Sequence, residues 1–113
     1  MQMLAVQREK GVTVIAPTVK RLDATVAPAF KQEVVQLVEG GDTRLVLDLA
    51  QVEFLDSSGL GAMVSILKAL GQRGSVVVCN VRGSVLSLFQ LTRMDKVFAL
   101  LPTRDEAVAR LAG

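Results

Sequence analysis

The order of apolar and polar residues predicts strands and helices that alternate along the whole chain. Short apolar segments bounded by turn residues are the expected strands, and they fall at residues 3–8, 12–17, 44–49, 75–79 and 97–101. Apolar residues spaced three and four apart indicate helices, which we expect at residues 24–39, 57–70, 84–91 and after Pro102. This alternation implies crossover connections and a mainly parallel sheet.

Three local signals refine this pattern. Gly11 favours a tight turn between the first two strands, so we expect them to form an antiparallel hairpin. Pro28 fits a helix only near its start, and Thr103 with Glu106 forms a capping box that opens the last helix. The sequence therefore predicts one α/β domain over residues 1–113, with a mainly parallel central sheet, an N-terminal antiparallel hairpin edge and about four helices.

Composition limits the location and the chemistry of the protein. Half of the 113 residues are hydrophobic but only 4% are aromatic, so we expect a core of aliphatic side chains. No apolar run approaches the roughly 18 residues of a membrane span, and the N-terminus lacks a signal-peptide pattern. We therefore predict a cytoplasmic protein that does not insert into membranes. Cys79 ends an apolar run, so we expect a buried hydrophobic residue there rather than a redox centre.

Charge and the lack of histidine exclude further classes of function. Thirteen basic and eleven acidic residues give a net charge of +2, and the basic residues are scattered, which argues against direct nucleic-acid binding. Without histidine the chain lacks the usual general base at neutral pH and the commonest metal ligand. We therefore expect no metal, no cofactor and no enzymatic activity.

The most informative segment is residues 46–61, where a buried strand and a short apolar connection lead to Asp56-Ser57-Ser58-Gly59 at the start of a helix. The free N–H groups and the dipole of a helix N-terminus stabilise negative charge. A serine at this point therefore suits two roles, capping the helix and carrying a phosphate.

Small residues surround this turn. Gly59 and Gly61 lie in the first helical turn, where each costs roughly 1 kcal/mol relative to alanine, and we expect their missing side chains to give a partner access. The stripe of this helix expected to face the core is Leu60, Met63, Val64, Leu67 and Leu70. A second stripe, of small residues that would let another backbone approach closely, is Ser58, Ala62, Ser65 and Ala69.

Two other kinds of chemistry have little support at this turn. A nucleophilic serine needs a base, and the turn offers no histidine and no Ser-x-x-Lys pair. A phosphoryl-accepting aspartate, Asp48 or Asp56, needs an acidic pair after the first strand to hold Mg²⁺, but residues 16–19 are Ala-Pro-Thr-Val. Asp23, before the first helix, has two interpretations: a helix cap, or a role beside the serine turn.

At these residues the chain resembles the STAS domain family, in particular the small single-domain anti-sigma factor antagonists. The resemblance covers nearly the whole chain and rests on Leu22-Asp23, residues 45–49, the motif of residues 54–61, Leu88-Phe89 and residues 94–98. Family members often have glycine before the Leu-Asp pair and in the late turn, where this chain has Lys20 and Arg93.

The resemblance implies a switch at Ser57, which a partner anti-sigma factor that is also a serine kinase would phosphorylate. The unphosphorylated form would bind this kinase and free a sigma factor, and a serine phosphatase would restore that form. Ser57 would then be both cap and switch, with Ser58 for capping and contact. The expected partner-binding residues are Asp23, Asp56, Ser58, Gly59, Gly61, Ala62, Ser65 and Ala69.

A second hypothesis stays open. The chain could be a non-catalytic STAS subunit that docks on a membrane transporter complex through its stripe of small residues. The exposed serine would then have no switching role.

Overall fold

The computed structural model describes residues 3–112 and has a five-stranded sheet in the order β1-β2-β4-β6-β7. Strand β1 is antiparallel to β2, and the other neighbours are parallel. The strands are β1 (Leu4–Glu9), β2 (Val12–Pro17), β4 (Arg44–Asp48), β6 (Ser75–Cys79) and β7 (Ala99–Leu101). The helices are α1 (Ala27–Glu39), α2 (Ser57–Leu70), α3 (Gly83–Leu91) and α4 (Arg104–Leu111). The α/β fold with a hairpin edge is confirmed.

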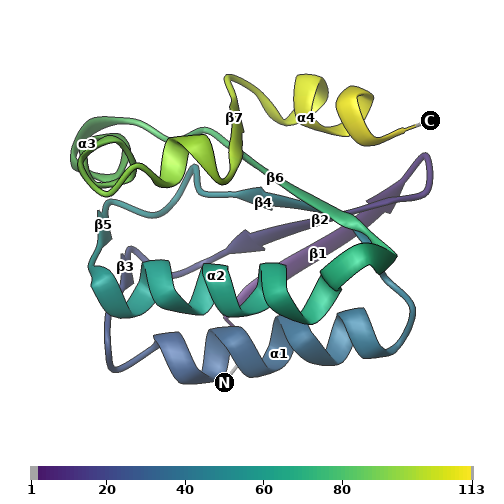
Figure 1. The fold of residues 1–113 in the computed structure, drawn as a ribbon, viewed down its shortest axis with the longest axis horizontal. Helices are drawn as coiled ribbons and strands as arrows, with labels where there is room; N and C mark the ends of the chain where they lie inside the picture. Colours follow the sequence, from purple (N-terminus) through teal and green to yellow (C-terminus); the bar gives the residue numbers. More distant parts are fainter. Residues whose placement is uncertain (1–2, 113) are drawn as a thin grey trace.

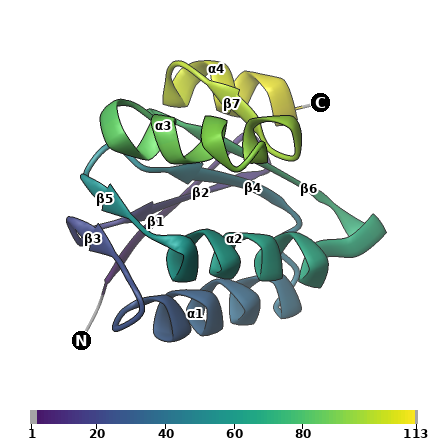
Figure 2. The same ribbon diagram turned by 60° about the vertical axis from the view of Figure 1, so that its left-hand side comes forward.

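Helices cover both faces of the sheet. Helices α1 and α2 lie side by side on one face, and α4 lies on the other (Figures 1 and 2). Side chains of β4 alternate between the two cores: Leu45 and Leu47 belong to the larger one, whereas Val46 packs with Ala107 and Val108 of α4. Both faces of this strand are therefore buried, which explains its nearly continuous apolar run.

A second, two-stranded parallel sheet was not predicted. It pairs β3 (Arg21–Leu22) with β5 (Phe54–Leu55), so that Arg21 lies opposite Phe54 and Leu22 opposite Leu55. These strands follow β2 and β4 in the chain, and they lie beyond the carboxyl ends of those strands in Figure 1. Each of these strands has two residues, which are too few to show any periodicity. The sequence pattern therefore predicted only a connection before the serine turn.

Helix α1 starts later than predicted, and Asp23 does not cap it. The residue at the cap position is Val26, and Pro28 lies in the first turn as expected. The carboxylate of Asp23 instead accepts a hydrogen bond from the N–H of Thr25, and its carbonyl accepts from Ala27. Asp23 thus closes a local turn between β3 and the helix, a common use of an aspartate.

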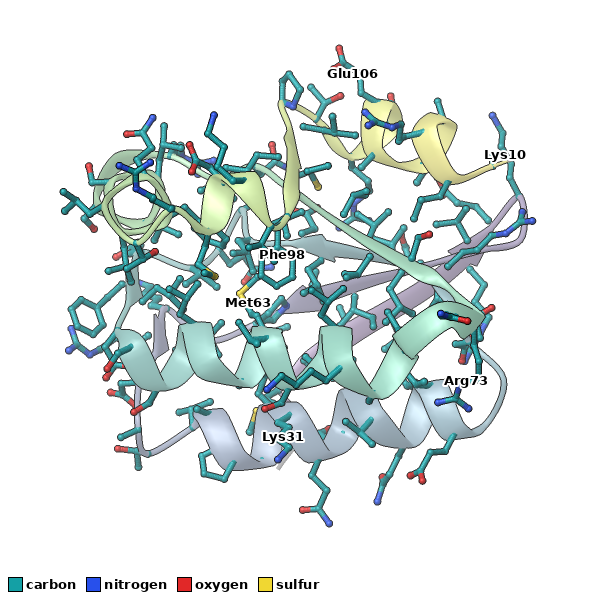
Figure 3. The ribbon with its side chains drawn as sticks, viewed as in Figure 1. Lys10, Lys31, Met63, Arg73, Phe98 and Glu106 are labelled. Atoms are coloured by element: carbon teal, nitrogen blue, oxygen red, sulfur yellow. The ribbon has the colours of Figure 1, made fainter. Side chains whose placement is uncertain are left out.

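The core face of α2 is largely as predicted. Leu60, Met63 and Leu70 are buried, and Figure 3 shows Met63 pointing toward Phe98 in the core. Val64 and Leu67 are only half-buried, whereas Ile66, missing from the predicted stripe, is fully buried. The buried stripe is therefore rotated slightly from the predicted one.

Short irregular segments join the later elements. Turns of 3₁₀-helix, η1 (Gly71–Arg73) and η2 (Met94–Lys96), follow α2 and α3. Just before η2, Arg93 has φ +61°, a left-handed conformation that costs an L residue about 1 kcal/mol or more. A glycine in this turn would adopt that conformation without strain. No helix in residues 3–112 is both long and apolar enough to cross a bilayer.

A partly buried charge network joins α4 to the sheet. Asp48, at the end of β4, accepts hydrogen bonds from Arg104 Nε at 2.8 Å and Asn80 Nδ2 at 2.9 Å. Burial acts to raise the pKa of Asp48, but these bonds and one from the N–H of Ala50 outweigh it and hold the pKa below its usual value. Beside this network Cys79 is buried as predicted, and burial raises the pKa of its thiol to about 12.

We predict that Asp48→Asn lowers the free energy of unfolding by about 2 kcal/mol at pH 7, because Arg104 loses its ionic partner inside the fold. The folded pKa of Asp48 is depressed, so its contribution is present above the unfolded pKa and is lost as pH falls through the folded pKa. Urea unfolding at a series of pH values should show the difference from wild type shrinking below about pH 4. Glu9→Gln, at an exposed hairpin position, is the control. A difference that stays constant into acid would contradict this role for Asp48.

Candidate functional site

The serine turn sits between β5 and α2, and Asp56 caps the helix. Asp56 has extended backbone angles, and its Oδ1 accepts hydrogen bonds from the N–H groups of Ser58 at 2.9 Å and Gly59 at 3.0 Å. Ser57 and Ser58 are the first residues of the helix itself. The prediction that these serines cap α2 is therefore wrong, because Asp56 occupies the N-cap position one residue earlier and its carboxylate accepts from the free N–H groups of the first turn.

Capping by Asp56 leaves Ser57 available. Its side chain is exposed, and among residues 3–112 its hydroxyl makes no hydrogen bond. The hydroxyl lies at the positive end of the α2 dipole, and the first turn of α2 holds no acidic side chain. The turn thus presents an unengaged hydroxyl where added negative charge is favoured by the helix.

The small sheet places charged and aromatic groups next to the turn. The N–H of Asp56 donates to the carbonyl of Leu22 at 3.4 Å. Asp23, the next residue after Leu22, therefore lies beside Asp56. Arg21 stacks over the ring of Phe54 at 4.0 Å and lies 3.6 Å from the carboxylate of Asp23. Arg21 and Phe54 were missed as site residues, since only the pairing of β3 with β5 brings them to the turn.

The two glycines of the turn have different environments. A Cβ on Gly59 would lie 2.3 Å from the carbonyl oxygen of Leu22 and 2.5 Å from Leu55, and Gly59 is buried. Its missing side chain therefore lets α2 approach β3, which corrects the prediction that it gives a partner access. A Cβ on Gly61 would meet nothing within 4 Å, and this residue is exposed.

The stripe of small residues faces α1 of the same chain. Ser58, Ala62 and Ser65 line a groove of about 620 Å³ between α1 and α2, whose opposite wall includes Pro28 and Lys31. Lys31 lies on α1 in the foreground of Figure 3. Ala69 does not line this groove, and its carbonyl instead accepts a hydrogen bond from Arg73. The element that packs next to the stripe of small residues is thus α1 of the same chain. The groove between the two helices remains open next to Ser58.

The turn offers little for metal or acid–base chemistry. Within residues 3–112 there is no group of three or more cysteine, aspartate or glutamate residues placed to hold a metal ion. Asp56 uses its carboxylate as a helix cap, so the nearest acid to Ser57 is engaged by backbone donors.

Comparison with known proteins agrees with this geometry. The sequence pattern of the STAS domain matches residues 3–107. The chain belongs to the STAS domain family. A curated relative is the anti-sigma-B factor antagonist of Listeria monocytogenes, which is 35% identical over 88 residues, covering 75% of this chain and 75% of the relative.

Solved structures place the fold in the same family. An anti-sigma factor antagonist from Mycobacterium paratuberculosis is similar with a TM-score of 0.87 and 32% identity, over 97% of this chain and 93% of that one. SpoIIAA, an anti-sigma factor antagonist solved in its unphosphorylated form, shares the fold with a TM-score of 0.79 at 19% identity, over 95% of this chain and 94% of that one. A structure of SpoIIAA from Bacillus in its phosphorylated form is also similar, with a TM-score of 0.70.

We predict that Asp56→Ala lowers the free energy of unfolding by about 1 kcal/mol, because two N–H groups of α2 lose their acceptor. Ser57→Ala, one position on, should change it by less than about 0.5 kcal/mol, since an exposed hydroxyl with no partner is removed. Chemical denaturation of both variants measures the difference. Equal losses in the two variants would show that the serine shares the capping role.

The two glycines provide a matched pair of substitutions. Gly59→Ala should destabilise the fold by about 2 kcal/mol, because its methyl group collides with the Leu22 carbonyl and α2 must shift. Gly61→Ala should be neutral or stabilise by up to about 1 kcal/mol, since its methyl group enters open space and alanine favours a helix. Thermal or urea unfolding checks both signs. A harmless Gly59→Ala would mean that the close approach of α2 to β3 is not required.

Proposed function

We propose that this STAS domain is an anti-sigma factor antagonist switched by phosphorylation of Ser57. In its unphosphorylated form it binds a partner anti-sigma factor that is also a serine kinase, and this binding releases a sigma factor. Phosphorylation of Ser57 ends the binding, and a serine phosphatase restores it. The domain itself is a non-catalytic regulator that acts in the cytoplasm, without a cofactor, direct contact with nucleic acid or insertion into a membrane.

The observation that carries this proposal is the free hydroxyl of Ser57 at the N-terminus of a helix that another residue caps. A kinase can bind and phosphorylate the exposed side chain without breaking any hydrogen bond of the fold. The names of the Listeria and Mycobacterium paratuberculosis relatives, both anti-sigma factor antagonists, support the choice of partner. SpoIIAA, which has the same fold, exists in phosphorylated and unphosphorylated forms.

Electrostatics explain how one phosphate switches a surface without unfolding it. The phosphate adds up to about two negative charges. The α2 dipole and its N-terminal N–H groups favour this charge, so the helix keeps its start. The carboxylates of Asp23 and Asp56 are already beside the turn, so the local surface becomes more acidic even with Arg21 next to Asp23. A partner that accepts the unmodified surface then meets repulsion and a bulky group at the centre of the contact.

The proposed contact surface surrounds the turn. It consists of Asp23, Asp56, Ser57, Ser58 and Gly61, and it continues along Ala62 and Ser65 into the groove beside α1. Gly59 supports this surface from inside, because it is buried against Leu22. Ala69 lies outside the groove, at the far end of α2.

A kinase assay tests the proposal. Incubated with ATP and candidate anti-sigma factor kinases from the same organism, the wild-type domain and Ser58→Ala should each gain one phosphate, and Ser57→Ala should gain none, as read by mass spectrometry. The matched Ser58→Ala control tests which of two adjacent exposed hydroxyls is used. Phosphate on Ser57→Ala would contradict the assignment.

A binding measurement tests the switch separately. Ser57→Asp should weaken binding to the same kinase by at least about tenfold relative to wild type, because it places a fixed charge on the contact surface. If Ser57→Asp binds as tightly as wild type, the switch is wrong. Capture of transporter subunits that is unaffected by Ser57→Ala would instead favour the structural STAS subunit.

A further inference from the structure

Strand β1 forms an open edge of the central sheet. It is the outermost strand, and after the buried Leu4 its five remaining residues are exposed. It pairs with β2 without a bulge over all six of its residues, and it contains no proline or lysine. Natural sheets usually block exposed edges with such features. The charged residues of β1, Arg8 and Glu9, lie at its hairpin end, so the segment of residues 4–7 is suited to pairing with another strand.

The hairpin turn determines which backbone groups of β1 face outward. Lys10 and Gly11 form a two-residue turn with φ of 55° and 76°, and Glu9 lies opposite Val12. Residues that flank such a turn exchange both backbone hydrogen bonds, and hydrogen-bonded pairs then alternate along the ladder. The inward-bonding residues of β1 are therefore the odd-numbered ones, in agreement with the bond from Thr18 N–H to the carbonyl of Met3 at 2.8 Å.

The even-numbered residues Leu4, Val6 and Arg8 consequently direct their N–H and C=O groups away from the sheet. In residues 3–112 no strand or loop supplies a partner to these backbone groups. The side chain of Arg8 is held away from the edge, because its Nη2 and Nε bond to Asp42 at 2.7 and 3.0 Å. The edge thus presents three residues whose backbone N–H donor and C=O acceptor both point outward.

We propose that a second copy of this chain pairs with this edge, β1 antiparallel to β1, about a twofold axis at Val6. In this register Leu4 lies opposite Arg8 of the second copy, Val6 opposite Val6, and Arg8 opposite Leu4. All three pairs then exchange both backbone hydrogen bonds, and the two central sheets become one continuous sheet. A twofold interface requires a self-complementary surface, and this order of residues supplies it.

The side chains beside the edge also fit a second copy. Leu4 and Val6 share a groove of about 260 Å³ with Glu33 and Leu37 of α1, and Val6 is 36% exposed. The proposed axis brings the two Val6 side chains together over the apolar part of the two grooves. The apolar contact between the two copies therefore falls in the same register as the backbone hydrogen bonds.

This interface leaves the serine turn open. The residues that line the edge groove come from β1 and α1, and none belongs to the segment of residues 54–61. A dimer joined through β1 would therefore present two copies of Ser57. It is independent of the switch, and either proposal can fail without the other.

Sedimentation of the full chain tests the pairing. Wild type should dimerise, and Val6→Pro should raise the dissociation constant at least about tenfold, because proline removes the outward N–H and clashes with the second strand. Proline is tolerated at an edge position whose N–H bonds nothing within the chain. Val6→Ile keeps the donor and the apolar side chain and should dimerise like wild type. A wild type that stays monomeric up to its solubility limit, or a folded Val6→Pro that dimerises as tightly, would overturn the proposal.

Crosslinking tests the register even if Val6→Pro fails to fold. Cα atoms of a hydrogen-bonded antiparallel pair lie about 5.5 Å apart, within the range of a disulfide. Under mild oxidation Val6→Cys should therefore form a covalent dimer faster than Ala5→Cys, which is exposed on the same strand but faces position 7 of the second copy. The buried Cys79 does not compete. Equal crosslinking rates in the two variants would contradict the twofold at Val6.

Discussion

The first turn of α2 can lie against β3 only because residue 59 has no side chain. The backbone of the helix passes so close to the carbonyl of Leu22 that even a methyl group would collide with it. This contact, together with the pairing of β3 with β5, sets the direction in which α2 begins. The position of every group at the serine turn follows from that direction.

Once the direction of α2 is set, Asp56 and Ser57 have different roles in the turn. Asp56 ends β5 and satisfies two N–H groups of α2, so the following serines are not needed as caps. Ser57 then points into solvent at the positive end of a helix whose inner face is buried in the core. A modification there changes charge at the surface, while the contacts that hold α2 lie on its other side, at Met63 and Ile66. The contacts that hold the fold and the proposed switch thus lie on different faces of one helix.

Sequence reasoning predicted the long elements and missed what tertiary pairing decides. Helix α2 and strand β2 have the predicted bounds, because α2 has a long apolar periodicity and β2 is an apolar segment that follows a clear turn signal at Gly11. The two-residue strands, and with them Arg21 and Phe54 at the turn, carry no periodic signal. The cap was assigned to the wrong residue because Asp, Ser and Ser in succession all suit the position. Gly59 was correctly singled out as unusual, but whether a bare backbone faces a partner or the core is decided only by packing.

The central claim is that phosphorylation of Ser57 alters a preformed surface and leaves the fold intact. Backbone amide NMR spectra of the domain before and after complete phosphorylation of Ser57 test it most directly. The account predicts shifts confined to the serine turn and its neighbours, residues 21–24 and 56–61, with the amides of the central sheet unchanged. Shifts spread through β2, β4 and β6, or loss of dispersion, would contradict it and indicate a switch that works by rearranging the domain.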